Sequence, residues 1–161
     1  MDSGVIERLE ALRPEIKAKW ETLLRVEPVS SPLASPDALV HLIDWTLDTL
    51  FHALRAHQTR RHPLRNEPAE GVTDFSALCS CGMNPLLAYF VAGEQALLEN
   101  LVLVQVRDGH STCERTKTAS ELKHTLSQVA RREIEAFCAV CQHREHQHHR
   151  TPAHPVPVLR R

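Results

Sequence analysis

Residues 85–106 constrain the fold of this chain more than any other stretch. Apolar side chains cover nearly the whole circumference of the helix that they predict. Asn84 can cap the first turn of that helix, and Pro85 suits its first position. A helix that is apolar all round has to be buried, so we expect other helices to surround it. Its apolar residues are Leu86, Leu87, Tyr89, Phe90, Val91, Leu97, Leu98, Leu101, Val102, Val104 and Val106.

A second long helix is predicted directly after this one. The sequence Asp108-Gly109-His110 indicates a short turn, and Ser111 with Glu114 forms the capping-box pattern that starts a helix. We expect this helix to end at about residue 143 and to pair with 85–106 as an antiparallel hairpin. Its inward stripe consists of Leu122, Leu126, Val129, Ile134, Phe137, Cys138 and Cys141.

The first third of the chain predicts two further helices. One covers 6–23, where Pro14 should produce a kink or a restart, and the other covers 37–57. A Pro- and Ser-rich linker, 26–36, separates them, and Ser35 can cap the second helix at Pro36. The apolar stripes are Ile6, Leu9, Leu12, Ile16, Trp20 and Leu23 in the first helix, and Leu39, Ile43, Leu47, Leu50 and Leu54 in the second.

Together these segments predict an all-α protein. Aromatic residues make up only 4% of the chain, so the core must rest on Leu, Val, Ile and Ala, which favours helices over sheet. We expect one up-down four-helix bundle over 1–143, with a kinked first helix and an irregular loop before the third. Residues 144–161, rich in His and Pro, are expected to form a disordered tail.

Charge and composition limit the classes of partner. The formal net charge is −1, so neither nucleic acid nor an anionic membrane is an expected partner. Residues 1–10 lack the features of a secretory signal, which indicates a cytoplasmic protein. The stretch 85–106 is long enough to span a membrane, but Glu94, Gln95, Glu99 and Asn100 interrupt it, so we interpret it as a buried helix of a soluble protein.

Cysteine spacing predicts a functional site. In a reducing compartment, paired cysteines indicate metal or redox sites rather than a disulfide framework. Cys79 and Cys81 precede the hairpin, and Cys138 and Cys141 lie near its end. Cys81 and Cys138 are each about 28 residues from the turn, so antiparallel helices bring the two pairs to the same level.

Four thiolates from two elements match the tetrahedral coordination of structural zinc. Cys138 and Cys141 are three residues apart on one helix face, while Gly82 allows the loop that carries Cys79 and Cys81 to bend around an ion. The single residue between Cys79 and Cys81 departs from the usual two-residue gap, and His143 could replace one thiolate.

Three alternatives to zinc remain open for these cysteines. An iron–sulfur cluster uses the same ligands, and paired thiols near a helix end can act as a reversible redox switch. Cys138 and Cys141 could also be small buried side chains without a metal. Cys113 lies at the opposite end of the hairpin and is excluded from the site.

Two other polar patterns contain residue types that can bind metal ions. His41, Asp44, Asp48 and His52 share a helix face, but such a row is usually the solvated side of an amphipathic helix. Glu121 and His124 have the Glu-x-x-His spacing of di-iron bundles, for which Glu94 and Glu99 could add carboxylates. The second Glu-x-x-His that such an enzyme needs on a facing helix is missing, and catalysis is unsupported.

The first two predicted helices resemble the N-terminal sensor domains of stressosome-type regulators. The resemblance implies a helical signalling or interaction module, often dimeric. With the cysteines, it leads us to expect a metal-binding regulatory or sensor module, whose partner is an unidentified protein or a second copy of the chain. The resemblance rests on Ile16, Trp20, Leu23 and Leu24, followed after the linker by Leu39, Ile43, Leu47 and Leu50.

Overall fold

The computed structural model describes residues 1–26, 35–59 and 84–148. Their secondary structure is entirely helical, which confirms the predicted all-α class. Within these ranges five helices have nine or more residues, rather than the four expected: α1 (Ser3–Ala11), α2 (Arg13–Val26), α4 (Ile43–Thr59), α5 (Pro85–Arg107) and α6 (Thr112–His148). The short helices α3 (Pro36–Leu39) and η2 (Val40–Leu42) lead into α4.

The fifth helix arises because the first predicted helix is split at Leu12. Pro14 has no backbone N–H, so it cannot donate the bond that would continue α1 into α2. The chain instead ends α1 with the N–H of Leu12 bonded to the carbonyl groups of Arg8 and Leu9. Pro14 then occupies the first turn of α2, where a missing N–H costs little. The expectation of a restart at this proline is confirmed.

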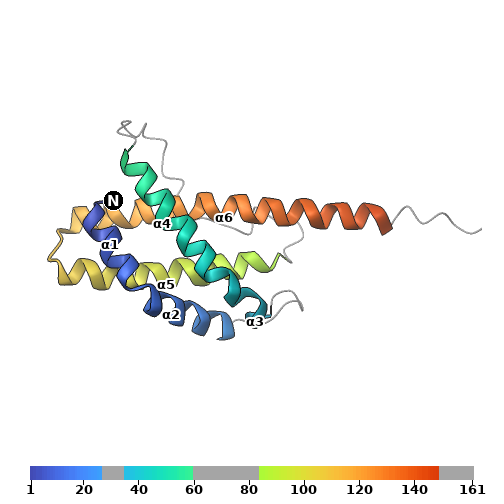
Figure 1. Cartoon of the computed structure of the whole chain (residues 1–161), viewed down its shortest axis with the longest axis horizontal. Coiled ribbons are helices and arrows are strands. Elements are labelled where there is room, and N and C mark those ends of the chain that lie inside the picture. Colours follow the sequence, from blue (N-terminus) through green and yellow to red (C-terminus); the bar gives the residue numbers. More distant parts are fainter. Residues whose placement is uncertain (27–34, 60–83, 149–161) are drawn as a thin grey trace, which may run out of the picture.

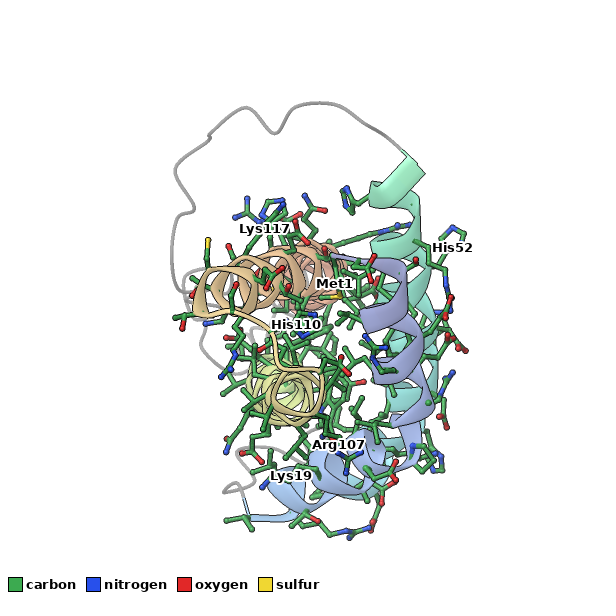
Figure 2. All side chains as sticks on the ribbon, turned by 90° about the vertical axis from the view of Figure 1, so that its left-hand side faces the viewer. Met1, Lys19, His52, Arg107, His110 and Lys117 are labelled. Atoms are coloured by element: carbon green, nitrogen blue, oxygen red, sulfur yellow. The ribbon has the colours of Figure 1, made fainter. Side chains whose placement is uncertain are left out.

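The helices are not arranged as the expected up-down bundle. Figure 1 shows α5 and α6 as a long antiparallel hairpin, with α4 running obliquely across both of them. The end-on view in Figure 2 places α1 and α4 on one side of this hairpin. An apolar stripe determines which face of a helix is buried but leaves the crossing angle open, so the sequence pattern did not predict the oblique path of α4.

A close contact between α2 and α5 organises the core. The indole of Trp20 covers Gly93, and its Nε1 donates to the carbonyl of Tyr89 at 2.9 Å. The Trp20 and Tyr89 ring centroids are 4.8 Å apart. The hydroxyl groups of Tyr89 and Thr46 are hydrogen-bonded at 2.8 Å, which ties α5 to α4 in the interior. One hydrophobic cluster thus draws on α1, α2, α4, α5 and α6.

The hairpin turn has the predicted chemistry. Gly109 adopts a positive φ of 66°, a conformation that glycine accepts without strain. Ser111 and Glu114 form the reciprocal capping box, because the Glu114 carboxylate accepts from the Ser111 N–H at 2.9 Å and the Ser111 Oγ accepts from the Glu114 N–H. Helix α6 continues to His148, beyond the expected end near residue 143, and its C-terminal part extends past the other helices (Figure 1).

Helix α5 is long and apolar enough to cross a membrane by length and composition. Half of the qualifying window is buried inside the protein, however, and α5 packs against α1, α2 and α6. Buried residues along its length include Phe90, Leu97, Leu101 and Val104. This burial accounts for the apolar residues on one face of α5. The expectation of a helix buried all round is only partly met, because Val91, Val102 and Val106 are more than half exposed.

Candidate metal centre

Asn84 connects the start of α5 to α6. Its Oδ1 accepts a hydrogen bond from the Leu86 N–H at 2.9 Å, which is the predicted N-cap. Its Nδ2 donates to the Ile134 carbonyl at 3.2 Å and lies 3.4 Å from the Cys138 Sγ. Asn84 is only 4% exposed, so this side chain bridges the two helices in the interior.

The register of the hairpin agrees with the equal-arm prediction. Asn84 and Ile134 each lie 25 residues from Gly109, and they are in direct contact. Cys138 is one turn further along α6, half-buried against the core. The antiparallel packing on which the equal-arm count depends is therefore present, and the meeting of the two cysteine pairs stays a prediction.

Of the predicted ligands, Cys138 is the one whose backbone and side chain both lie within the described residues. Cys79 and Cys81 lie outside the described residues, and so do the side chains of Cys141 and His143, whose backbones belong to α6. Among the described side chains, no group of three or more His, Cys, Asp or Glu is placed to hold a metal ion. The four-cysteine site therefore stays a prediction.

The described surroundings of Cys138 include an amide donor. An amide N–H can donate a hydrogen bond to sulfur, and it brings no positive charge that would repel a metal ion. The Asn84 Nδ2 occupies that donor position. Sequence reasoning recognised Asn84 only as a helix cap. Its contact with Cys138 depends on the packing of α5 against α6.

Cys113 lies at the other end of the hairpin, as predicted. It is the second residue of α6 and is exposed. Because the length of α5 separates it from Asn84, Cys113 cannot join Cys138 in one site.

The polar row on α4 is engaged in ion pairs with α2. The Asp44 carboxylate contacts the Lys17 Nζ at 2.5 Å and the Arg13 Nε at 3.5 Å, and Asp48 contacts the Arg13 Nη1 at 2.6 Å. The hydrogen bond from Lys17 is the main reason that the pKa of Asp44 lies below its usual value. Asp44 and Asp48 thus already have cationic partners on α2, and among the described residues this row forms no group of three or more metal ligands.

The di-iron pattern also fails to assemble in the part of the chain that is described. Glu121 pairs with the amino group of Met1, and the exposed His124 contacts Gln128 at 3.0 Å. Of the two possible additional carboxylates, Glu94 pairs with Lys123 at 2.9 Å and Glu99 with Lys19 at 2.8 Å. Each acid thus faces a separate cationic partner.

Comparison with known proteins gave no significant match to a family model, a curated protein or a solved structure.

Proposed function

We propose that this protein is a small helical regulatory or interaction module in which Cys79, Cys81, Cys138 and Cys141 bind one zinc ion. The observation that carries the proposal is the contact of Asn84 with both Leu86 and Cys138. It places a cysteine of α6 beside the chain segment that leads into α5. The role of the ion would be to fasten that segment to α6.

The lengths of chain involved are compatible with a single ion. Three residues of extended chain span at most about 10 Å, so Cys81 has to lie within that distance of Asn84. Cys141 follows Cys138 by three residues, about 4.5 Å along the helix axis and on the same face. These chain lengths allow all four cysteines to reach one tetrahedral centre.

Zinc is favoured over other ions by the ligand type. Four thiolates suit tetrahedral Zn²⁺, whose binding energy contributes directly to folding. Such a site would hold residues 79–84 on α6 and stabilise the helix pair whenever the metal is bound. A protein whose surface or stability depends on metal in this way can act as a sensor or as a metal-stabilised binding module.

Thermal unfolding of tag-free, reduced protein tests this proposal. Excess chelator should lower the melting temperature, and one equivalent of zinc should restore it. The variant Cys138→Ser should melt at the same temperature with and without chelator, whereas the matched control Cys113→Ser should respond like wild type. An equal chelator response in both variants would contradict the proposal.

Two alternatives predict other results in the same samples. An iron–sulfur cluster would give visible absorbance in protein purified without oxygen. A thiol switch would give a disulfide between the cysteine pairs on mild oxidation and no metal dependence. Both use the same cysteines, so spectra and thiol titration have to accompany the melts.

A further inference from the structure

The outer face of α5 carries an apolar row that no described helix covers. Val91, Val102 and Val106 are 54%, 53% and 59% exposed, and Leu98 between them is partly exposed. Steps of seven and four residues place these side chains on one face of the helix. Figure 2 shows α1 and α4 together on one side of the α5–α6 hairpin. We call Leu87, Val91, Gln95, Leu98, Val102 and Val106 the α5 stripe.

The α5 stripe is symmetric about its own centre. Val91 and Val102 are equidistant from the midpoint between Ala96 and Leu97, as are Gln95 and Leu98, and Leu87 and Val106. If a second α5 is laid antiparallel across a two-fold axis at this midpoint, each member faces its counterpart in one layer. Antiparallel coiled coils pack in such layers, and an isologous contact requires such self-complementarity.

Charge at the borders of the stripe is also self-complementary. Glu94 is paired with Lys123 of α6 on one border, and Glu99 is paired with Lys19 of α2 on the other. In an antiparallel dimer, the two-fold axis brings each border of the stripe against the same border of the second copy. Each of the two resulting border contacts then contains two carboxylates and two ammonium groups. Opposite charges can alternate there without repulsion between like groups.

We propose that the α5 stripe is the interface of a symmetric antiparallel homodimer. The interface uses only described helices and is independent of the metal site. Gln95 donates a hydrogen bond to Glu99 at 2.9 Å, so its amide has a partner at the border of the stripe.

Sedimentation equilibrium over a dilution series tests the interface. Wild type should sediment as two chains and dissociate on dilution. Val102→Asp and Val91→Asp should raise the dimer dissociation constant at least about tenfold, because the two-fold axis places two charges in an apolar contact. The matched control Val140→Asp alters an equally exposed valine on α6, 60% exposed and outside the stripe, and should remain dimeric. All three should keep the wild-type circular dichroism spectrum.

Cysteine cross-linking tests the orientation. In the antiparallel pair, residue 91 meets residue 102 of the other copy, so the double variant Val91→Cys, Val102→Cys should form a covalent dimer on oxidation. The single variant Val91→Cys should not exceed the wild-type background, because its two copies lie about 16 Å apart along the axis.

Three outcomes would overturn the proposal. One is wild type that sediments as a single chain at every concentration. Another is a dimer that survives both aspartate variants, which would assign the contact to another face. The last combines two results: wild type is monomeric and binds phosphatidylcholine–phosphatidylglycerol vesicles, and the Val102→Asp variant does not bind them. This outcome would assign the stripe to a membrane surface.

Discussion

The Nδ2 of Asn84 lies 3.4 Å from the Cys138 Sγ, so the residue that caps α5 also contacts the candidate metal ligand on α6. One side chain thereby couples the start of the core helix to the chemistry of the thiol. The same side chain accepts the hydrogen bond that caps the first turn of α5. This coupling makes Asn84 the most informative position for mutation.

We expect Asn84→Asp to weaken zinc binding about 10- to 100-fold, the usual effect of losing a partner that orients a metal ligand. The aspartate keeps a capping oxygen but replaces the N–H donor with a negative charge beside the sulfur. Asn84→Ser, which caps without that charge, is the matched control and should bind zinc more tightly than the aspartate. Competition with a chromophoric chelator measures the zinc affinities of wild type and both variants, and wild-type affinity in both variants would contradict a role for this contact.

Gly93→Ala should destabilise the protein by about 1–3 kcal/mol. A Cβ at this position would lie 2.5 Å from the Cε2 and Cη2 of Trp20, so the α2–α5 packing has to shift. At an exposed helix position, exchanging glycine for alanine would instead stabilise by roughly 0.5–1 kcal/mol. Ala88→Gly, on the exposed side of α5, measures that propensity effect. Urea unfolding measures both variants. If Gly93→Ala were more stable than wild type, the close packing of Trp20 on Gly93 would be contradicted.

The buried hydrogen bond between Thr46 and Tyr89 should be visible in a double-mutant cycle. Tyr89→Phe leaves the Thr46 hydroxyl buried without this partner and should cost about 1–2 kcal/mol. Adding Thr46→Val removes the other polar group and should recover most of that loss, because both partners are then apolar. Urea unfolding of the four proteins gives the coupling energy. Strictly additive effects would mean that the two hydroxyl groups do not interact.

Acid unfolding should depend on Asp44. Its pKa is lowered in the folded state, mainly by the hydrogen bond from Lys17. A depressed carboxyl pKa contributes stability above the ordinary value of 3.8, and this contribution is lost as the pH falls through the folded pKa. Half-exposed ion pairs are screened by solvent, so we expect about 0.2–1 kcal/mol at neutral pH.

Asp44→Asn should therefore reduce stability at neutral pH and flatten the acid limb of the stability curve. Asp37→Asn is the control, because Asp37 is 79% exposed and its ion pair within the described residues is with Arg25, at 3.2 Å. Urea unfolding at a series of pH values compares the two variants. If stability fell more steeply with decreasing pH in Asp44→Asn than in wild type, the proposed contribution of the Asp44 carboxylate would be contradicted.

Local sequence signals predicted the hairpin in detail. The Asn84-Pro85 start, the turn at Gly109 and the Ser111–Glu114 box each depend on neighbouring residues, and all three are present. In the structure, Cys138 lies beside Asn84 at the start of α5, while the predicted meeting of the two cysteine pairs is not tested.

Features that depend on tertiary packing were not predictable in this way. The oblique path of α4 is linked to the contacts of Tyr89 with Trp20 and Thr46, which join residues far apart in the chain. The Asn84–Cys138 contact was missed for the same reason. Residues 144–148 contain good helix formers and no proline, which is why α6 continues past the predicted end.

Elemental analysis of full-length, tag-free protein tests the central claim most directly. Protein dialysed against a weak chelator, to remove ions held loosely by the His-rich C-terminal residues, should retain one zinc per chain. Cys113→Ser should retain the same amount, and Cys138→Ser should lose it. Wild-type protein that is reduced and freshly purified yet holds no metal, or Cys138→Ser protein that holds as much zinc as wild type, would contradict the account.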